Sequence, residues 1–111
     1  INNWHPGLSL DENAQYSEKS IALLAARAKR AMFEYVPFRP QPDEVERVYR
    51  AYAYGPHMEV FLLDERSYRG ANGANRQPVM EPATAMLGRP QLEWLKVRLL
   101  TSSATWKVVA T

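Results

Sequence analysis

The chain has 111 residues, and its 14 Lys and Arg against 12 Asp and Glu leave a formal net charge of only +2. This length excludes two separate cores, and this charge argues against a protein that binds polyanions through bulk charge. The absence of cysteine excludes a disulfide framework, a thiolate nucleophile and a cysteine-based zinc site. The hydrophobic content of 46% and the lack of any apolar run near roughly 20 residues predict a soluble globular chain without a membrane span.

Both ends of the sequence differ from the usual ends of a domain. Residues 1–6 contain no initiator Met and lack the charged and apolar regions of a signal peptide. Residues 106–110 have the pattern of a buried strand and are followed by only one residue. Because domains normally end in polar, exposed chain, we expect residues 1–111 to be an internal segment of one larger domain, incomplete at both ends.

The first half of the chain predicts a helix followed by two strands. Apolar residues recur at helical spacing over residues 14–35, and Asn13, Ser17 or Ser20 could cap this helix. Prolines make residues 36–42 an extended connector. Residues 47–54 and 58–63 are predicted strands, joined by a turn at Gly55 and Pro56. The unbroken apolar run at residues 60–63 favours a strand that is buried on both faces.

The second half predicts a loop, a helix and a last strand. The loop covers residues 64–78 and is rich in Gly, Asn and Arg. The helix covers residues 90–100, with Leu92, Leu95 and Leu99 on its inward face, and the strand covers residues 105–110. A strand, a loop, a helix and a strand in this order form a crossover between parallel strands. The predicted fold class is therefore α/β, with α+β layering.

The loop at residues 64–78 is the first candidate for chemistry. Arg66, Arg69 and Arg76 are forked donors, and Gly70 and Gly73 allow backbone N–H groups to point into one concavity. This combination suits an anion such as phosphate. The alternative, which spacing alone favours, is a solvated loop whose arginines pair with the acidic residues at positions 64, 65 and 81. Neither a P-loop nor a dinucleotide fingerprint is present.

The two imidazoles and the first asparagines give weaker signals. His5 and His57 form neither a metal-ligand pair nor a triad, and His57 is most simply a turn residue. The side-chain carbonyls of Asn2 and Asn3 are neutral ligands for hard cations, although loop Asn is usually a turn former.

The tyrosines of the first predicted strand raise the possibility of base stacking. Strand alternation places Tyr52 and Tyr54 on one face and Tyr49 on the other, which divides such a platform. Packing in the core is the favoured role of these aromatic residues, and no specific nucleic-acid readout is expected.

Several phrases occur together and in a fixed order, from one end of the chain to the other. The whole sequence resembles the middle of the PhoD-like alkaline phosphatase/phosphodiesterase family, and the phrases are INNWHPG at residues 1–7, RPQPDE at 39–44, VYR at 48–50, YGP at 54–56, LDERSYRG at 63–70, NGANRQ at 72–77, LG at 87–88 and QLEWL at 91–95.

The resemblance implies a fold and a site. The fold is a calcineurin-like metallophosphatase β-sandwich flanked by helices, of which residues 1–111 would be an incomplete piece of the catalytic domain. Family members carry an Asp-Asp-His-Glu run directly before the Asn-Asn-Trp phrase, and later Gly-Asp-x-His ligands; both lie outside this sequence. Asn2, and next Asn3, are the expected metal ligands. Asn2 is also an expected phosphate contact, while Arg66 and Arg69 either contact phosphate or support the loop, the latter being favoured.

The resemblance also implies the partners of the site. Phosphomonoesters or phosphodiesters are the expected substrates, calcium and iron the suspected metals, and a secreted, periplasmic or cell-surface location is expected. Metal-assisted hydrolysis needs several carboxylate or His ligands held together, so the segment alone is expected to be inactive without the remainder of the parent chain. A non-catalytic interaction or oligomerisation segment and, less favoured, a nucleic-acid-binding module remain as alternatives.

Overall fold

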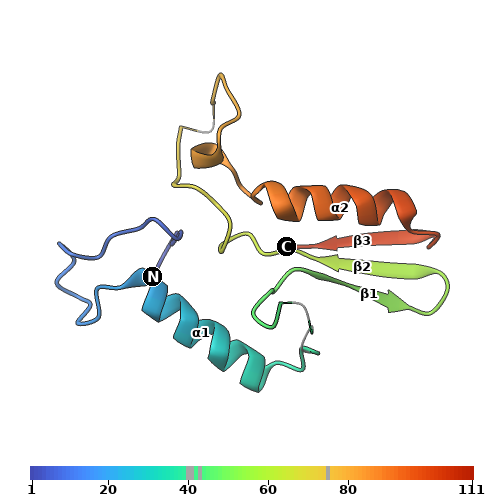
Figure 1. Ribbon diagram of the computed structural model, residues 1–111, viewed down its shortest axis with the longest axis horizontal. Helices are drawn as coiled ribbons and strands as arrows, with labels where there is room; N and C mark the ends of the chain where they lie inside the picture. The colour runs from blue at the N-terminus through green and yellow to red at the C-terminus, as the bar shows by residue number, and fades with distance from the viewer. Residues whose placement is uncertain (40–41, 43, 75) are drawn as a thin grey trace.

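A computed structural model describes residues 1–39, 42, 44–74 and 76–111 (Figure 1). The predicted connector at residues 36–42 therefore lies partly outside the described residues. The elements, in chain order, are α1 (Ile21–Tyr35), β1 (Arg50–Tyr54), β2 (Met58–Leu62), the short 3-10 helix η1 (Pro82–Thr84), α2 (Arg89–Thr101) and β3 (Trp106–Ala110). Among these described elements, no helix is both long and apolar enough to cross a membrane.

The three strands form one mixed sheet in the order β1-β2-β3. β1 and β2 are antiparallel, with Tyr52 opposite Val60, which confirms the hairpin. β2 and β3 are parallel, with Val60 opposite Val108, and α2 connects them, which confirms the crossover. Figure 1 shows α2 running alongside the sheet, while α1 lies on the other side of β1. The α+β class predicted from the sequence is confirmed.

The first helix is shorter than the sequence predicted, because it begins at Ile21 and not near residue 14. The Ser20 hydroxyl oxygen caps it by accepting the Leu23 N–H at 3.2 Å. Before the cap, short polar side chains bind the backbone locally: Asn13 Oδ1 accepts the Gln15 N–H at 3.0 Å, and Glu18 Oε1 accepts the Ser20 N–H at 2.8 Å. Such local bonds compete with helical ones, so the helix cannot extend further toward the N-terminus.

The first strand also begins later than predicted, at Arg50 and not at residue 47. The Arg47 N–H donates to the Glu44 carbonyl at 3.1 Å in a turn, and the Arg47 carbonyl accepts a hydrogen bond from the Arg50 side chain. The backbone of Arg47 is therefore used within this corner and is not available to the sheet.

Burial in the sheet differs from the sequence prediction. β2 is not equally buried on both faces: Glu59 and Phe61 lie buried toward α2, whereas Met58, Val60 and Leu62 are only half-buried. β3, predicted to be buried, is largely exposed, with Trp106 68% exposed. The physical reason is that α2 covers one face of the sheet, and only the Arg50 end of the other face is covered in the described part of the chain.

The inward face of α2 also differs from the prediction. Leu95 is buried and Leu99 half-buried, as expected, but Leu92 is exposed. The residue one turn before Leu95 that enters the core is Gln91, whose side chain is fully buried at 0% exposure. A polar side chain at such a position needs hydrogen-bond partners, and these define the candidate site below.

The described residues are spread out for a chain of this length. The radius of gyration is 16.3 Å and the principal extents are 51 × 40 × 22 Å. A compact domain of this length has a radius of gyration near roughly 13 Å. Large apolar side chains on the sheet, among them Tyr54, Trp106, Val108 and Val109, are exposed. The described residues alone therefore bury only part of their apolar surface.

Candidate functional site

The candidate site is built around the chain that leaves β2. The last hydrogen bond of the sheet here joins the Leu63 N–H to the Ala110 carbonyl at 2.9 Å. Directly after it, the Gln91 side chain binds both polar groups of the Asp64 backbone. Its Oε1 accepts the Asp64 N–H at 2.7 Å, and its Nε2 donates to the Asp64 carbonyl at 2.9 Å. Gln91 thus takes over as a hydrogen-bond partner where the sheet ends.

The Asp64 carboxylate organises the next turn of the loop. Oδ1 accepts the N–H groups of Arg66 at 2.9 Å and Ser67 at 2.8 Å. The residue is only 6% exposed, and Oδ2 is buried without a hydrogen-bond partner among the described residues. Asp64 therefore fixes the backbone of Arg66 and Ser67 relative to the end of β2.

The aromatic ring of Tyr68 fixes the middle of the loop. It packs edge-on against the ring of Tyr49, with 5.5 Å between the ring centroids. The ring centroid of Tyr49 in turn lies 4.9 Å from that of Trp94 in α2. Burial, followed by the charge of nearby Glu44, raises the pKa of Tyr68 to about 12.

The tyrosines considered as a stacking platform are divided between the two faces of the sheet, as predicted. Tyr49 is buried in the core, whereas Tyr52 and Tyr54 are exposed on the opposite face.

The far end of the loop is held by close backbone packing. The Gly70 N–H donates to the Ala85 carbonyl at 2.8 Å. A Cβ at position 70 would lie 1.9 Å from the Ala83 carbonyl oxygen, so no larger residue fits without a shift of the backbone. Gly88, with φ of +70°, packs in the same way against Tyr68. The loop from Asp64 to Gly70 is therefore fixed at its start, its middle and its end.

The two arginines of this loop have different surroundings. Arg69 is tethered within the loop, because Nε donates to the Gly70 carbonyl at 3.3 Å and Nη2 donates to Asn72 Oδ1. Arg66 has no such tether in the described chain, and its Nη1 is buried without a partner. Among the described residues neither guanidinium forms an ion pair with Asp64, Glu65 or Glu81, so the pairing that spacing favoured is not observed for these two arginines. Arg76 is exposed further along the chain.

Asn2 and Asn3 lie in an exposed turn at the N-terminus. The backbone of Asn3 has a φ of 52°, a left-handed conformation that Asn adopts more readily than most residues. The following residues, Trp4 and Pro6, line a cavity of about 190 Å³ together with Ser67 of the loop and residues of α1. This cavity brings the N-terminal segment beside the loop that carries Arg66.

The described residues do not by themselves form a metal site. Within them, no group of three His, Asp or Glu side chains lies close enough together to hold an ion. The amide oxygens of Asn2 and Asn3 are neutral and exposed, and neutral ligands alone do not fit the cations that activate water for hydrolysis. Any metal would need charged ligands from outside these residues.

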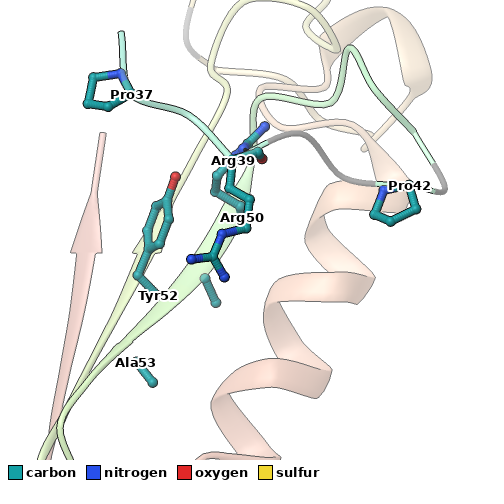
Figure 2. Close-up of a pocket in the computed structure, with 7 residues that line it drawn as sticks. Pro37, Arg39, Pro42, Arg50, Tyr52 and Ala53 are labelled. Atoms are coloured by element: carbon teal, nitrogen blue, oxygen red, sulfur yellow. Dashed lines mark hydrogen bonds between the residues drawn. The ribbon is translucent and has the colours of Figure 1, made fainter. Parts of the chain in front are cut away.

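A larger hollow of about 580 Å³ lies beside β1 and is lined by Pro37, Arg39, Pro42 and residues 50–53 (Figure 2). Arg50 is 2% exposed, and its guanidinium already donates to the carbonyls of Val48 at 2.9 Å and Arg39 at 2.7 Å. Because these donors are used within the protein, Arg50 holds the chain together and is not available to an anion.

The histidines add no second site in the described chain. The backbone carbonyl of His57 accepts the Trp106 N–H at 2.8 Å, which fits its expected role as a turn residue before β2. The backbone carbonyl of His5 accepts the Leu8 N–H at 3.0 Å in a loop turn.

The sequence analysis did not predict the role of Gln91. A signal for it was present, because Gln91 lies four residues before Leu95 and therefore on the inward face of the predicted helix. A lone Gln at such a position indicates a buried side chain that forms hydrogen bonds.

Comparison with known proteins decides the family. The family model described as PhoD-like phosphatase matches residues 1–111. The chain belongs to the PhoD-like phosphatase family. Alkaline phosphatase D of Bacillus subtilis (strain 168) is 33% identical over 104 residues, which cover 85% of this chain and 18% of that protein.

A solved structure supports the same assignment to the PhoD-like family. The structure titled "Structure of PhoD" has a TM-score of 0.68 and 28% identity, and the match covers 97% of this chain and 22% of that one. The chain therefore spans less than a quarter of the length of these relatives. The resemblance to the family and the family fold class predicted from the sequence are both confirmed.

Proposed function

We propose that residues 1–111 are a segment of a metal-dependent phosphoester hydrolase whose substrates are phosphomonoesters or phosphodiesters. The match of the PhoD-like phosphatase model to the whole chain carries this proposal. The matched region covers only 18% and 22% of the two relatives, so we assign the complete catalytic domain to a longer chain that contains these residues. We call that longer chain the full-length protein.

In this proposal, Arg66 contacts the substrate phosphate and Arg69 supports the loop. The assignment rests on their different surroundings: the guanidinium of Arg69 is already bound by Gly70 and Asn72, whereas Arg66 Nη1 is buried without a partner in the described chain. A fixed backbone with an unused guanidinium is a preorganised donor for an anion. The role of Arg66 thus differs from the supporting role that the sequence favoured for both arginines.

Asn2 provides one amide oxygen to the metal or to the phosphate, and Asn3 is the second candidate. Support comes from the position of the N-terminal segment, which shares a cavity with Ser67, the neighbour of Arg66. The charged metal ligands come from the rest of the full-length protein, because the described residues hold none in a cluster. Calcium and iron are the metals we propose to test first.

The apolar face of the sheet supports the proposal that the remainder of the protein completes the domain. On this face, away from α2, Tyr54, Trp106 and Val108 are exposed. Covering such a face with apolar side chains is the ordinary way in which a sheet completes its core. The 111-residue segment alone is therefore proposed to be inactive and only partly stable.

The test compares the full-length protein with the isolated segment, using bis(p-nitrophenyl) phosphate with added calcium or iron. We expect metal-dependent turnover by the full-length protein and none by the segment. Turnover by the segment near the full-length rate would refute its dependence on the rest of the chain. Lack of turnover by the metal-loaded full-length protein, with phosphomonoesters as well, would refute the proposed activity.

The assignment of Asn2 has a separate test by elemental analysis. Asn2→Ala in the full-length protein is expected to lower the metal content per chain, whereas Asn3→Gly should retain the left-handed turn while removing the Asn3 side chain. Unchanged metal content in Asn2→Ala would refute the assignment as a ligand. A loss only in Asn3→Gly would transfer that role to Asn3.

A further inference from the structure

The buried side chain of Gln91 has no role in the proposed chemistry, although burying a polar amide in the core costs free energy. Its amide makes three hydrogen bonds, two to the backbone of Asp64 and one from Nε2 to the Leu87 carbonyl at 2.9 Å. An apolar side chain would fill the same place in the core without needing partners. The amide is therefore best explained by what it holds, which is the first residue of the loop after β2.

We propose that Gln91 is a positioning residue for Arg66 and that it acts through Asp64. This inference rests on the proposed function of Arg66 as the phosphate contact. The connection has two steps: Gln91 binds the Asp64 backbone, and Asp64 Oδ1 accepts the N–H groups of Arg66 and Ser67. α2 thereby sets where the Arg66 side chain leaves the backbone.

The other end of the loop has anchors that Gln91 does not bind directly, since its third hydrogen bond reaches only the Leu87 carbonyl beside Gly88. Tyr68 packs against Tyr49 and Gly88, and Gly70 is bound to Ala85. The Arg69 guanidinium takes its partners from the anchor Gly70 and from Asn72, which lies beyond it. Loss of the Gln91 amide should therefore displace Arg66 and leave Arg69 in place. This difference separates a positioning role from a general loss of stability.

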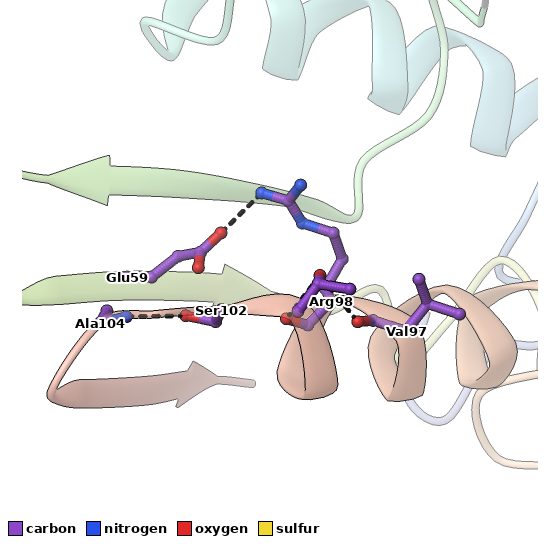
Figure 3. Close-up of polar contacts among 6 residues, drawn as sticks. Glu59, Val97, Arg98, Ser102 and Ala104 are labelled. Carbon is purple, nitrogen blue, oxygen red and sulfur yellow. Dashed lines mark hydrogen bonds and ion pairs between the residues drawn. The ribbon is translucent and has the colours of Figure 1, made fainter.

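A second polar connection between α2 and β2 provides a matched control. Arg98, seven residues after Gln91 on the same helix, donates from Nη2 to Glu59 Oε1 at 2.6 Å (Figure 3). This ion pair joins the same helix to β2 itself and does not involve the loop. Arg98→Met should weaken the packing of α2 without displacing Arg66.

The test is a set of double-mutant cycles in the full-length protein, with kcat/KM for bis(p-nitrophenyl) phosphate as the readout. Gln91→Met is expected to lower kcat/KM by roughly 10- to 100-fold, as when a substrate-contacting group moves by about 1 Å. In an Arg66→Met background the same change should cost about twofold or less, because the displaced group is already gone. In an Arg69→Met background it should retain its full effect, and Arg98→Met should leave kcat/KM unchanged.

Asp64→Ala tests the second step, and it keeps the proposal testable if the Gln91→Met variant does not fold. It removes the bonds to the Arg66 and Ser67 N–H groups, keeps the backbone atoms that Gln91 binds, and removes the unpartnered Oδ2. We expect the same coupling to Arg66. Hydrogen exchange of the peptide that contains Arg66 and Ser67 should accelerate in Gln91→Met and Asp64→Ala, but not in Arg98→Met.

The outcomes distinguish this inference from the function on which it rests. If Arg66→Met keeps the wild-type kcat/KM, the proposed role of Arg66 is wrong, and the positioning role is overturned with it. If Arg66→Met loses activity but the Gln91 effect is additive with it, or if exchange at Arg66 and Ser67 is unchanged, only the positioning role is overturned.

Discussion

The guanidinium of Arg50 lies 4.6 Å above the ring centroid of Phe38 and 5.5 Å from that of Phe33. Its N–H groups donate to the carbonyls of Val48, Arg39 and Arg47. One buried cation thus joins the last turn of α1, the chain that follows it and the start of β1. Arg50 therefore connects α1 to the sheet.

Arg50→Met is therefore expected to lower the free energy of unfolding of the full-length protein by about 3 kcal/mol, since it leaves three carbonyls without their donor and removes the stacking. Denaturant unfolding measures the change. Arg30→Met is the matched control, because Arg30 is exposed and pairs with Glu34 on the same helix. Equal midpoints for the two variants would contradict the role assigned to Arg50.

Tyr68 predicts a specific dependence of stability on alkaline pH. Burial raises its pKa to about 12 from an ordinary value of 10.0, so between these values the folded protein holds a proton that the unfolded chain has lost. Stability must then fall as pH rises through this window, because the folded state binds more protons. Unfolding free energies measured from pH 9 to 12 should decline more steeply in the wild type than in Tyr68→Phe. Parallel profiles would show that Tyr68 titrates normally.

Gly70 predicts a large cost for the smallest possible substitution. Gly70→Ala places a methyl group within 1.9 Å of the Ala83 carbonyl oxygen, and the neighbour is backbone that cannot rotate away. We expect a loss of about 2 to 3 kcal/mol in the free energy of unfolding, the range for overpacking a tight site. Gly7→Ala is the control, since its nearest neighbour would be the His5 side chain at 3.6 Å. A neutral Gly70→Ala would refute the close packing of the loop.

The order of the main helices and strands could be predicted from the sequence, but the burial of the sheet could not. The hairpin at Gly55 and the crossover through α2 follow from local turn signals and periodicity, and both are confirmed. The burial of β3 depends on which chain lies against it, and its apolar sequence gave no sign that Trp106 and Val108 would be exposed within residues 1–111. The start of α1 was missed because side-chain bonds at Asn13 and Glu18 compete with the helix.

The location of the candidate site could be predicted from the sequence, but the different surroundings of Arg66 and Arg69 could not. The position of the Arg-rich loop directly after β2 follows from the sequence order. The Gln91 amide binds Asp64, which is distant in the chain. The local tether of Arg69 and the unpartnered Arg66 Nη1 depend on the conformation that the loop adopts in the fold. Spacing alone treats Arg66 and Arg69 as equivalent, and only the fold distinguishes them.

The most direct test of this distinction compares kcat/KM for bis(p-nitrophenyl) phosphate in Arg66→Met and Arg69→Met of the full-length protein, with metal content checked in both. Losing a charged donor to the phosphate should cost Arg66→Met about 10- to 100-fold. Arg69→Met removes only bonds within the loop, so its fold-loss in kcat/KM should be less than about a tenth of the fold-loss in Arg66→Met. Equal losses, or a larger loss in Arg69→Met at unchanged metal content, would contradict the assignment of Arg66 as the phosphate contact.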